Sequence, residues 1–136
     1  MIIFGQLPGA ANLKTFLRLI PMVIIMGIIF LLSHQPHDFF KLPKIIGFDK
    51  VAHAAAYAVL GASLLYGLKP FIRSSNRGLF GITVVMFCLI YGISDEFHQS
   101  FIPGRQVSGW DVVADVFGGA FVVILWYARF QKLGSK

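Results

Sequence analysis

Acidic, histidine and amide residues recur in this chain four positions apart, the spacing that puts side chains on one face of a helix. Asp49, His53 and Tyr57 form one such series. The same spacing joins two later pairs, Asp95 with Gln99 and Asp111 with Asp115. Three helical faces that carry carboxylates, an imidazole and an amide are therefore the places where chemistry could be done.

These residue types can transfer protons, bind a divalent cation or recognise a phosphate. The residues that we predict for proton transfer or cation binding are Asp49, His53, Asp95, Glu96 and Asp111. The residues that we predict to contact a substrate are Lys50, Tyr57, Gln99, Arg105 and Asp115. A mixed set of aspartate, glutamate and histidine suits zinc or manganese, whereas carboxylates alone suit magnesium or calcium. No His-x-x-x-His spacing is present, so the identity of any cation stays open.

The elements that must position these residues are membrane helices. Hydrophobic residues make up 57% of the 136-residue chain and charged residues 13%, against about 25% charged residues in an ordinary soluble domain. Such a composition cannot build a water-facing surface, so the bilayer is the solvent. Apolar segments predict helices over about 16–32, 51–68, 79–97 and 110–130. We expect an all-α membrane protein, a bundle of four transmembrane helices that forms one domain over residues 1–136.

Four residues predict local features of these helices. Pro21 near the start of the first segment can begin that helix or kink it. Gly118 and Gly119 allow another helix to approach the fourth segment closely. Cys88 is the only cysteine, so an internal disulfide is excluded and a packing role is expected.

Basic residues are concentrated on one side of the predicted membrane topology. Eight of them and no acid lie before or at the start of the first segment, between the second and third, and at or after the end of the fourth. The opposite side holds all six acids and all four histidines. Because cytoplasmic loops are rich in lysine and arginine, we expect both termini in the cytoplasm and the polar residues at the extracytoplasmic boundary. The net charge of +6 then reports topology, and we expect no nucleic-acid partner.

The three polar faces are expected to meet, because helices joined by short loops pack as antiparallel neighbours. Charged groups within membrane helices are costly and face the bundle interior, paired with one another. We predict that seven side chains contact one another directly or through water or an ion: Asp49, His53, Asp95, Glu96, Gln99, Arg105 and Asp111. We expect His34, His37 and Asp38 to lie in a solvated loop.

Several of these residues also have a purely structural explanation. Asp111 with Ser108 resembles a helix capping box, and Asp49 can stabilise the N-terminus of its helix. His53 can serve as a hydrogen bond between helices. These alternatives do not explain why no acid lies on the side that holds eight of the twelve basic residues.

The chain resembles the VanZ-like family of bacterial membrane proteins in three motifs. These are Asp49-Lys50-Val51-Ala52-His53 with Tyr57, then Asp95-Glu96-Phe97-His98-Gln99, then Arg105 and Asp111. Ser33-His34-Gln35-Pro36 also resembles the usual end of the family's first helix, and the resemblance runs from about Leu19 to Trp126. One position departs from the family pattern, because Asp115 stands where the family usually has an amide.

The resemblance implies a multi-pass protein of the bacterial cytoplasmic membrane with a role in the cell envelope. The family takes its name from a protein that lowers sensitivity to the glycopeptide antibiotic teicoplanin, and this name does not supply a mechanism. One hypothesis is an enzyme that acts on lipid phosphate headgroups or lipid-linked envelope precursors, with a divalent cation as a candidate cofactor. In it, Lys50 and Arg105 bind phosphate, and His53 or a carboxylate transfers a proton. The cation would be held by four acids: Asp49, Asp95, Glu96 and Asp111.

The alternative hypotheses involve no chemistry. The protein could bind membrane lipids or a glycopeptide, or be a small transporter or flippase subunit. Four helices without an internal repeat are few for alternating access, and a homodimer would supply a second half. In the remaining alternative the polar residues only hold the bundle together.

Overall fold

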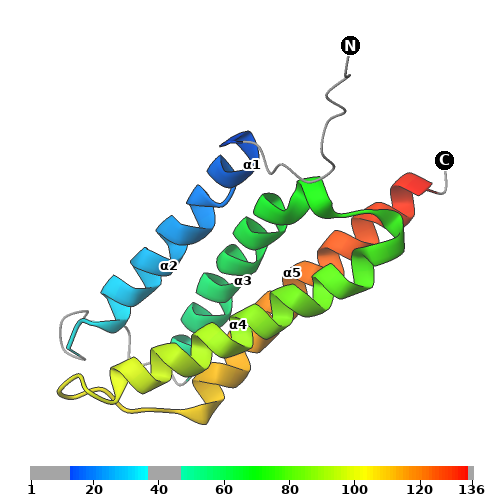
Figure 1. Cartoon of the computed structure of the whole chain (residues 1–136). Helices are drawn as coiled ribbons and strands as arrows, with labels where there is room; N and C mark the ends of the chain where they lie inside the picture. The colour runs from blue at the N-terminus through cyan, green and yellow to red at the C-terminus, as the bar shows by residue number, and fades with distance from the viewer. Residues whose placement is uncertain (1–12, 37–46, 135–136) are drawn as a thin grey trace.

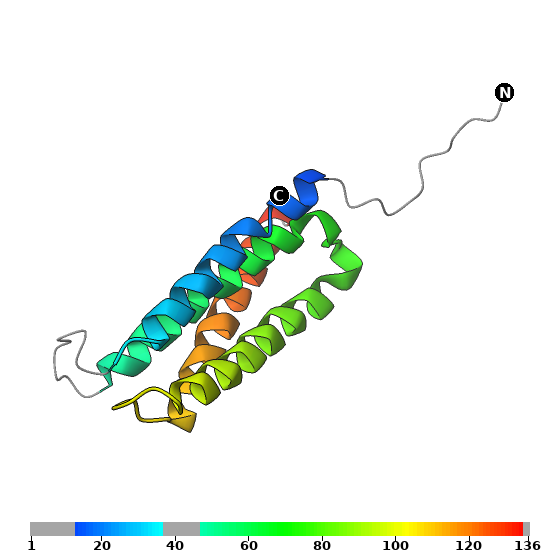
Figure 2. The same ribbon diagram turned by 60° about the vertical axis from the view of Figure 1, so that its left-hand side comes forward.

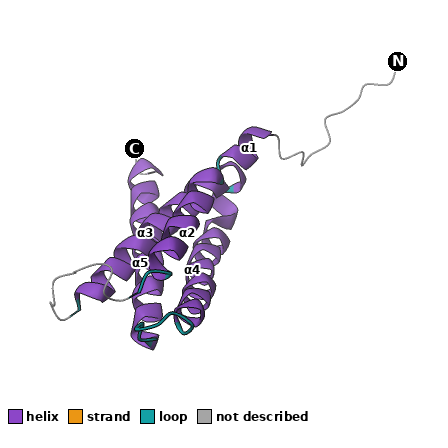
Figure 3. Ribbon diagram, turned by 90° about the vertical axis from the view of Figure 1, so that its left-hand side faces the viewer, coloured by secondary structure: helices purple, strands orange, loops and turns teal. Residues whose placement is uncertain are grey.

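The computed structural model describes residues 13–36 and 47–134, and this part of the chain consists of helices and turns without a strand (Figure 3). In chain order the elements are α1 (Leu13–Leu17), α2 (Ile20–Ser33), α3 (Phe48–Leu68), η1 (Lys69–Phe71), η2 (Ser74–Asn76), α4 (Arg77–Gln99) and α5 (Gly109–Gly134). The four longer helices run alternately in opposite directions (Figure 1). The all-helical prediction and its four apolar segments are confirmed. His37 and Asp38, predicted to be solvated, lie outside the described residues.

Three of the helices are long and apolar enough to cross a membrane, and they occupy Phe48–Phe71, Arg77–Gln99 and Gly109–Phe130. The remaining apolar helix, α2, has only 14 residues. At 1.5 Å per residue it is about 21 Å long, shorter than the roughly 30 Å hydrocarbon core of a bilayer. The described chain is therefore a membrane bundle of three long apolar helices and one shorter apolar helix.

The shortness of α2 follows from Pro21. Proline lacks a backbone N–H, and its ring collides with the carbonyl four residues earlier, here that of Leu17 at the end of α1. The structure places Pro21 in the first turn of α2, after a break at Arg18 and Leu19 that separates α1 from α2. Pro21 was predicted either to begin a helix or to kink one, and it begins one.

Large apolar side chains cover the outside of the bundle. Eight of them on α3, α4 and α5 are each more than 60% exposed: Val51, Leu79, Ile82, Ile90, Phe97, Trp110, Phe117 and Ile124. An apolar surface that extends over three helices would be unfavourable in water. In a bilayer it faces the acyl chains, as the composition predicts.

The bundle is organised around α3, which lies between α2 and α5 (Figure 2). Gly118 of α5 lies against the backbone of Ala54 and Ala58 in α3, where a side chain would collide with main-chain atoms. Gly119 leaves room for the buried Cys88 of α4. The close helix approach predicted from the two glycines is therefore present, and small residues at a helix contact are typical of membrane bundles.

Four helix termini meet at one end of the bundle. They are the C-terminal ends of α2 and α4 and the N-terminal ends of α3 and α5 (Figure 1). All the acidic residues that the structure describes lie on these termini or within two turns of them. This arrangement gathers side chains that are far apart in the sequence.

Candidate functional site

A histidine–aspartate pair lies between α3 and α5. His53 Nδ1 and Asp115 Oδ1 are 2.9 Å apart and form a hydrogen bond. Asp115 is fully buried, and Gly92 of α4 makes room for it, because a Cβ at Gly92 would lie 2.7 Å from Asp115 Oδ2. The bond orients the imidazole and holds the proton on Nδ1, so Nε2 is left to accept a proton or bind a ligand.

An ion-pair chain runs from the rim of the bundle to the start of α5. Lys50 Nζ lies 2.9 Å from Asp49 Oδ2 and 2.6 Å from Asp111 Oδ1. The side chain of Asp49 is 58% exposed, whereas that of Asp111 is 9% exposed. Asp111 also lies in the first turn of α5, where a negative charge favours the helix dipole. Asp111 thus has both a structural role and a place in the polar cluster, and Asp49 is a rim residue.

Glu96 of α4 points toward the start of α5. It is 4% exposed, and its Oε2 accepts a hydrogen bond of 2.8 Å from the backbone N–H of Ser108. Its Oε1 is buried without a hydrogen-bond partner in the described part of the chain. One potential ligand atom from each of Glu96, His53 and Asp111 lies within 4.8 Å of the other two. Three helices therefore contribute to one group of possible cation ligands.

Asp95, the next residue on α4, points toward α2 instead. Its Oδ2 accepts hydrogen bonds from Ser33 Oγ at 2.9 Å and from Gln99 Nε2 at 3.1 Å, and all three residues are buried. The seven side chains predicted to contact one another therefore do not form one cluster. Asp95 and Gln99 face α2, whereas Glu96 lies with His53 and Asp111. Ser33 was not among the predicted site residues, and its only sequence signal was the family-like motif at the end of the first helix.

Arg105 joins the loop after α4 to the end of α2. Its Nε donates to the carbonyl of Gln35 at 3.1 Å, and its Nη2 donates to the carbonyls of Leu32 at 2.9 Å and Ser33 at 3.4 Å. Carbonyls at the end of a helix lack an N–H four residues further on, and that of Leu32 accepts a turn bond from the Gln35 N–H at 3.2 Å. The guanidinium adds donors at this end and so caps the helix. Arg105 therefore has a structural role that the sequence analysis did not predict, and its Nη1 takes no part in these bonds.

A cavity of about 310 Å³ opens between α2, α3 and α4. Six predicted site residues line it: Asp49, His53, Tyr57, Asp95, Gln99 and Arg105. The rest of the lining comes from Ile29, Leu32, Ser33, Ala52 and Ala56. His53 belongs to both the cavity wall and the group with Glu96, Asp111 and Asp115, so it connects the two parts of the site.

A second pair of histidines lies outside this cavity. His34 Nδ1 and His98 Nε2 are 3.2 Å apart, and both rings pack against Phe30. His34 is exposed, as predicted, but it is the C-cap of α2 rather than a loop residue. No carboxylate contact of this pair is present among the described residues, so it offers less for catalysis than His53.

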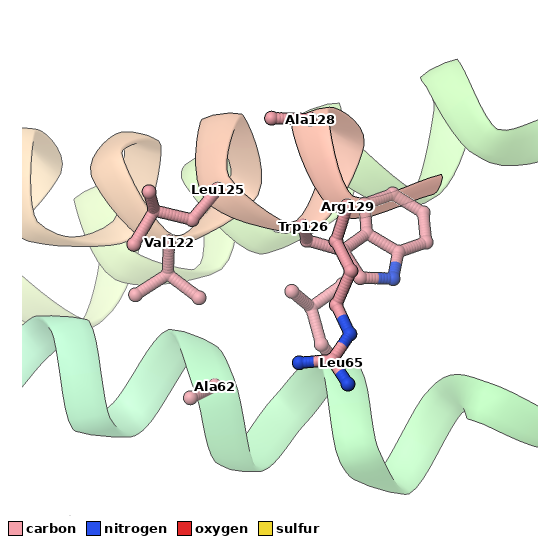
Figure 4. Close-up of a pocket in the computed structure, with 7 residues that line it drawn as sticks. All are labelled: Ala62, Leu65, Val122, Leu125, Trp126, Ala128 and Arg129. Atoms are coloured by element: carbon pink, nitrogen blue, oxygen red, sulfur yellow. The ribbon is translucent and has the colours of Figure 1, made fainter. Parts of the chain in front are cut away.

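A larger groove of about 570 Å³ lies between α3 and α5, toward the opposite end of the bundle. Figure 4 shows its lining residues: Ala62, Leu65, Val122, Leu125, Trp126, Ala128 and Arg129. Its only charged group is the guanidinium of Arg129, which extends from α5 toward Leu65. The groove offers contacts to an acyl chain but no acid–base group, so the smaller polar cavity is the candidate functional site.

The helical membrane bundle and its polar end define the class of this protein. A family model described as VanZ/LLP1 matches residues 2–130, almost the whole chain. The chain belongs to the VanZ-like family, as its motifs predicted. No curated protein and no solved structure matches it.

Proposed function

We propose that this protein binds a phosphorylated membrane lipid or lipid-linked envelope precursor in the cavity between α2, α3 and α4. The observation that carries the proposal is the amphipathic lining of that cavity. Ile29, Leu32 and Ala56 provide apolar contacts, whereas Asp95, Gln99 and Arg105 provide polar ones. A ligand with an acyl chain and a polar headgroup matches both parts.

The polar groups of the cavity suit hydroxyl, amine and phosphate groups. Asp95 and Gln99 can bond to headgroup hydroxyls or amines, and the buried hydroxyl of Tyr57 has no hydrogen-bond partner in the described chain. Nη1 of Arg105 remains for a phosphate oxygen, since the α2 carbonyls use Nε and Nη2. Lys50, which is 40% exposed, adds a second positive charge at the rim.

A cavity-filling variant tests binding. Ala56→Leu places a branched side chain in the polar cavity, and Ala62→Leu does the same on α3 in the groove toward α5. The protein is purified in mild detergent, and its bound lipids are identified by mass spectrometry. We expect Ala56→Leu to lose about tenfold or more of the phosphorylated lipid that the wild-type chain enriches, while Ala62→Leu retains it.

Equal lipid content in the two variants would contradict the proposal. Thermal stability, measured on the same variants, separates lost binding from lost folding.

The same samples are examined for cleaved headgroups, because catalysis is the second candidate function. It is favoured by one observation, the hydrogen bond that His53 makes to Asp115, which orients the imidazole at the cavity wall. A link to teicoplanin tolerance would follow from either function through the envelope precursors involved.

The proposal places the cavity at the extracytoplasmic boundary and both termini in the cytoplasm. The basic residues of the chain support this orientation, because Arg73 and Arg77 lie at the end of the bundle opposite to the acids. Reporter fusions at Arg73 and Lys136 should report cytoplasm, and a fusion at Lys41 should report the outside. An extracytoplasmic signal from Lys136 would reverse the assignment.

A further inference from the structure

We propose that His53, Glu96 and Asp111 bind a divalent cation, Zn²⁺ or Mn²⁺, at the junction of α3, α4 and α5. One ligand atom from each side chain lies within 4.8 Å of the other two. Around a tetrahedral ion, ligands with bonds of about 2.1 Å lie about 3.4 Å from one another. The three ligand atoms therefore have to approach one another by up to about 1.4 Å to coordinate the ion.

Each of the three side chains has an atom available for an ion. Glu96 Oε1 is buried and has no hydrogen-bond partner among the described residues. Asp111 bonds to Lys50 through Oδ1, which leaves Oδ2. His53 bonds to Asp115 through Nδ1, which leaves Nε2. A nearly fully buried carboxylate oxygen without a partner is costly, and an ion would supply the partner.

The surrounding groups hold these side chains as the outer shell of a metal site does. A histidine that binds a metal usually donates its other N–H to a carboxylate, and Asp115 accepts from His53 in this way. The backbone N–H of Ser108 fixes Glu96 through Oε2, and Lys50 fixes Asp111. Asp49 and Asp95 are possible ligands by sequence, but Asp49 pairs with Lys50 and Asp95 bonds to Ser33 and Gln99.

Charge balance also favours a cation at this position. Glu96, Asp111 and Asp115 are all buried. Among the described residues Lys50 is the only lysine or arginine paired with any of them, and Asp115 is bonded to the imidazole of His53. Buried carboxylates that share one region repel one another unless positive charge compensates them. One imidazole and two carboxylates suit zinc or manganese better than calcium, which prefers six to eight oxygen ligands.

The inferred ion would also explain how an acidic site accepts a phosphate, and this step rests on the proposed function. His53 lines the lipid cavity, so an ion bound to it would lie at the cavity wall. Three protein ligands leave open coordination positions, which a phosphate oxygen of a headgroup can occupy. The ion would then offset the negative charge of Glu96 and Asp111 toward that headgroup.

Mn²⁺ alone, without added lipid, tests the site. The full-length protein in detergent is stripped with a chelator and titrated with Mn²⁺, and free and bound ion are measured by electron paramagnetic resonance. We expect one saturable Mn²⁺ per chain that Zn²⁺ displaces, with nitrogen coupling from an imidazole. His53→Gln should remove that coupling, and His53→Gln, Glu96→Gln and Asp111→Asn should each weaken binding about tenfold or more.

Two control variants keep the site charged and folded. His34→Ala and His98→Ala each remove a histidine at the same end of the bundle but none of the three ligands. Both should bind Mn²⁺ with wild-type affinity. Absence of saturable binding up to about 1 mM, or nitrogen coupling that is lost in His98→Ala instead, would overturn the proposal. Three ligand variants are compared, so two remain informative if one of them misfolds. Lipid binding is tested separately, so failure of the cation proposal leaves that result unaffected.

Discussion

Alanine at Gly118 is expected to destabilise the whole bundle. A Cβ at this position would meet the carbonyl of Ala54 and the backbone nitrogen of Ala58 in α3. Main-chain atoms of a helix cannot move aside as a flexible side chain does, so α3 and α5 must separate along their contact. Overpacking of this kind costs on the order of 1–3 kcal/mol, and we expect thermal unfolding in detergent to occur several degrees lower.

Gly27→Ala is the matched control for this variant. Gly27 lies within α2, and a Cβ there would have no other atom within 4 Å. Alanine is the better helix former by roughly 0.5–1 kcal/mol, so this variant should be as stable as the wild-type protein or slightly more stable. Equal melting temperatures for the two variants would show that α5 does not pack against α3 as described.

The sequence predicts the helices well because the membrane imposes a simple rule. A span needs a run of apolar residues, and such runs mark α3, α4 and α5 directly. Close contact at Gly118 is also predictable, since small residues allow helices to approach in membranes. The division of the first segment depends on where Pro21 falls within the first turn, and apolarity alone does not determine that position.

The candidate site was predictable as a set of faces but not as a set of contacts. Four-residue spacing correctly puts Asp95 with Gln99 and brings His53 to the interior. It cannot tell that Asp95 faces α2 while the adjacent Glu96 faces α5, because this depends on how far α4 is rotated about its axis. Arg105 was harder still, since a loop residue has no periodicity that shows which helix it caps.

Removing the His53 side chain is expected to lower the free energy of unfolding more than removing the charge of its partner, Asp115. In His53→Ala the fully buried Asp115 loses its only hydrogen bond among the described residues, and its Oδ2 already has none. Breaking a buried pair by removing one member costs about 3–5 kcal/mol. Chemical unfolding in detergent, monitored through the decrease in helix content, should show this lower free energy of unfolding directly.

Asp115→Asn separates the charge of the pair from its hydrogen bond. The amide oxygen can still accept from His53 Nδ1, and the VanZ-like family usually carries an amide at this position, so we expect a change of no more than about 1 kcal/mol. Because a neutral amide is cheaper to leave without a partner than a carboxylate, the double variant His53→Ala/Asp115→Asn should be more stable than His53→Ala alone. The difference between the double variant and the sum of the single variants measures the coupling of the pair. Strict additivity would mean that Asp115 does not depend on His53 for its burial, and the orienting role of Asp115 would then have to be abandoned.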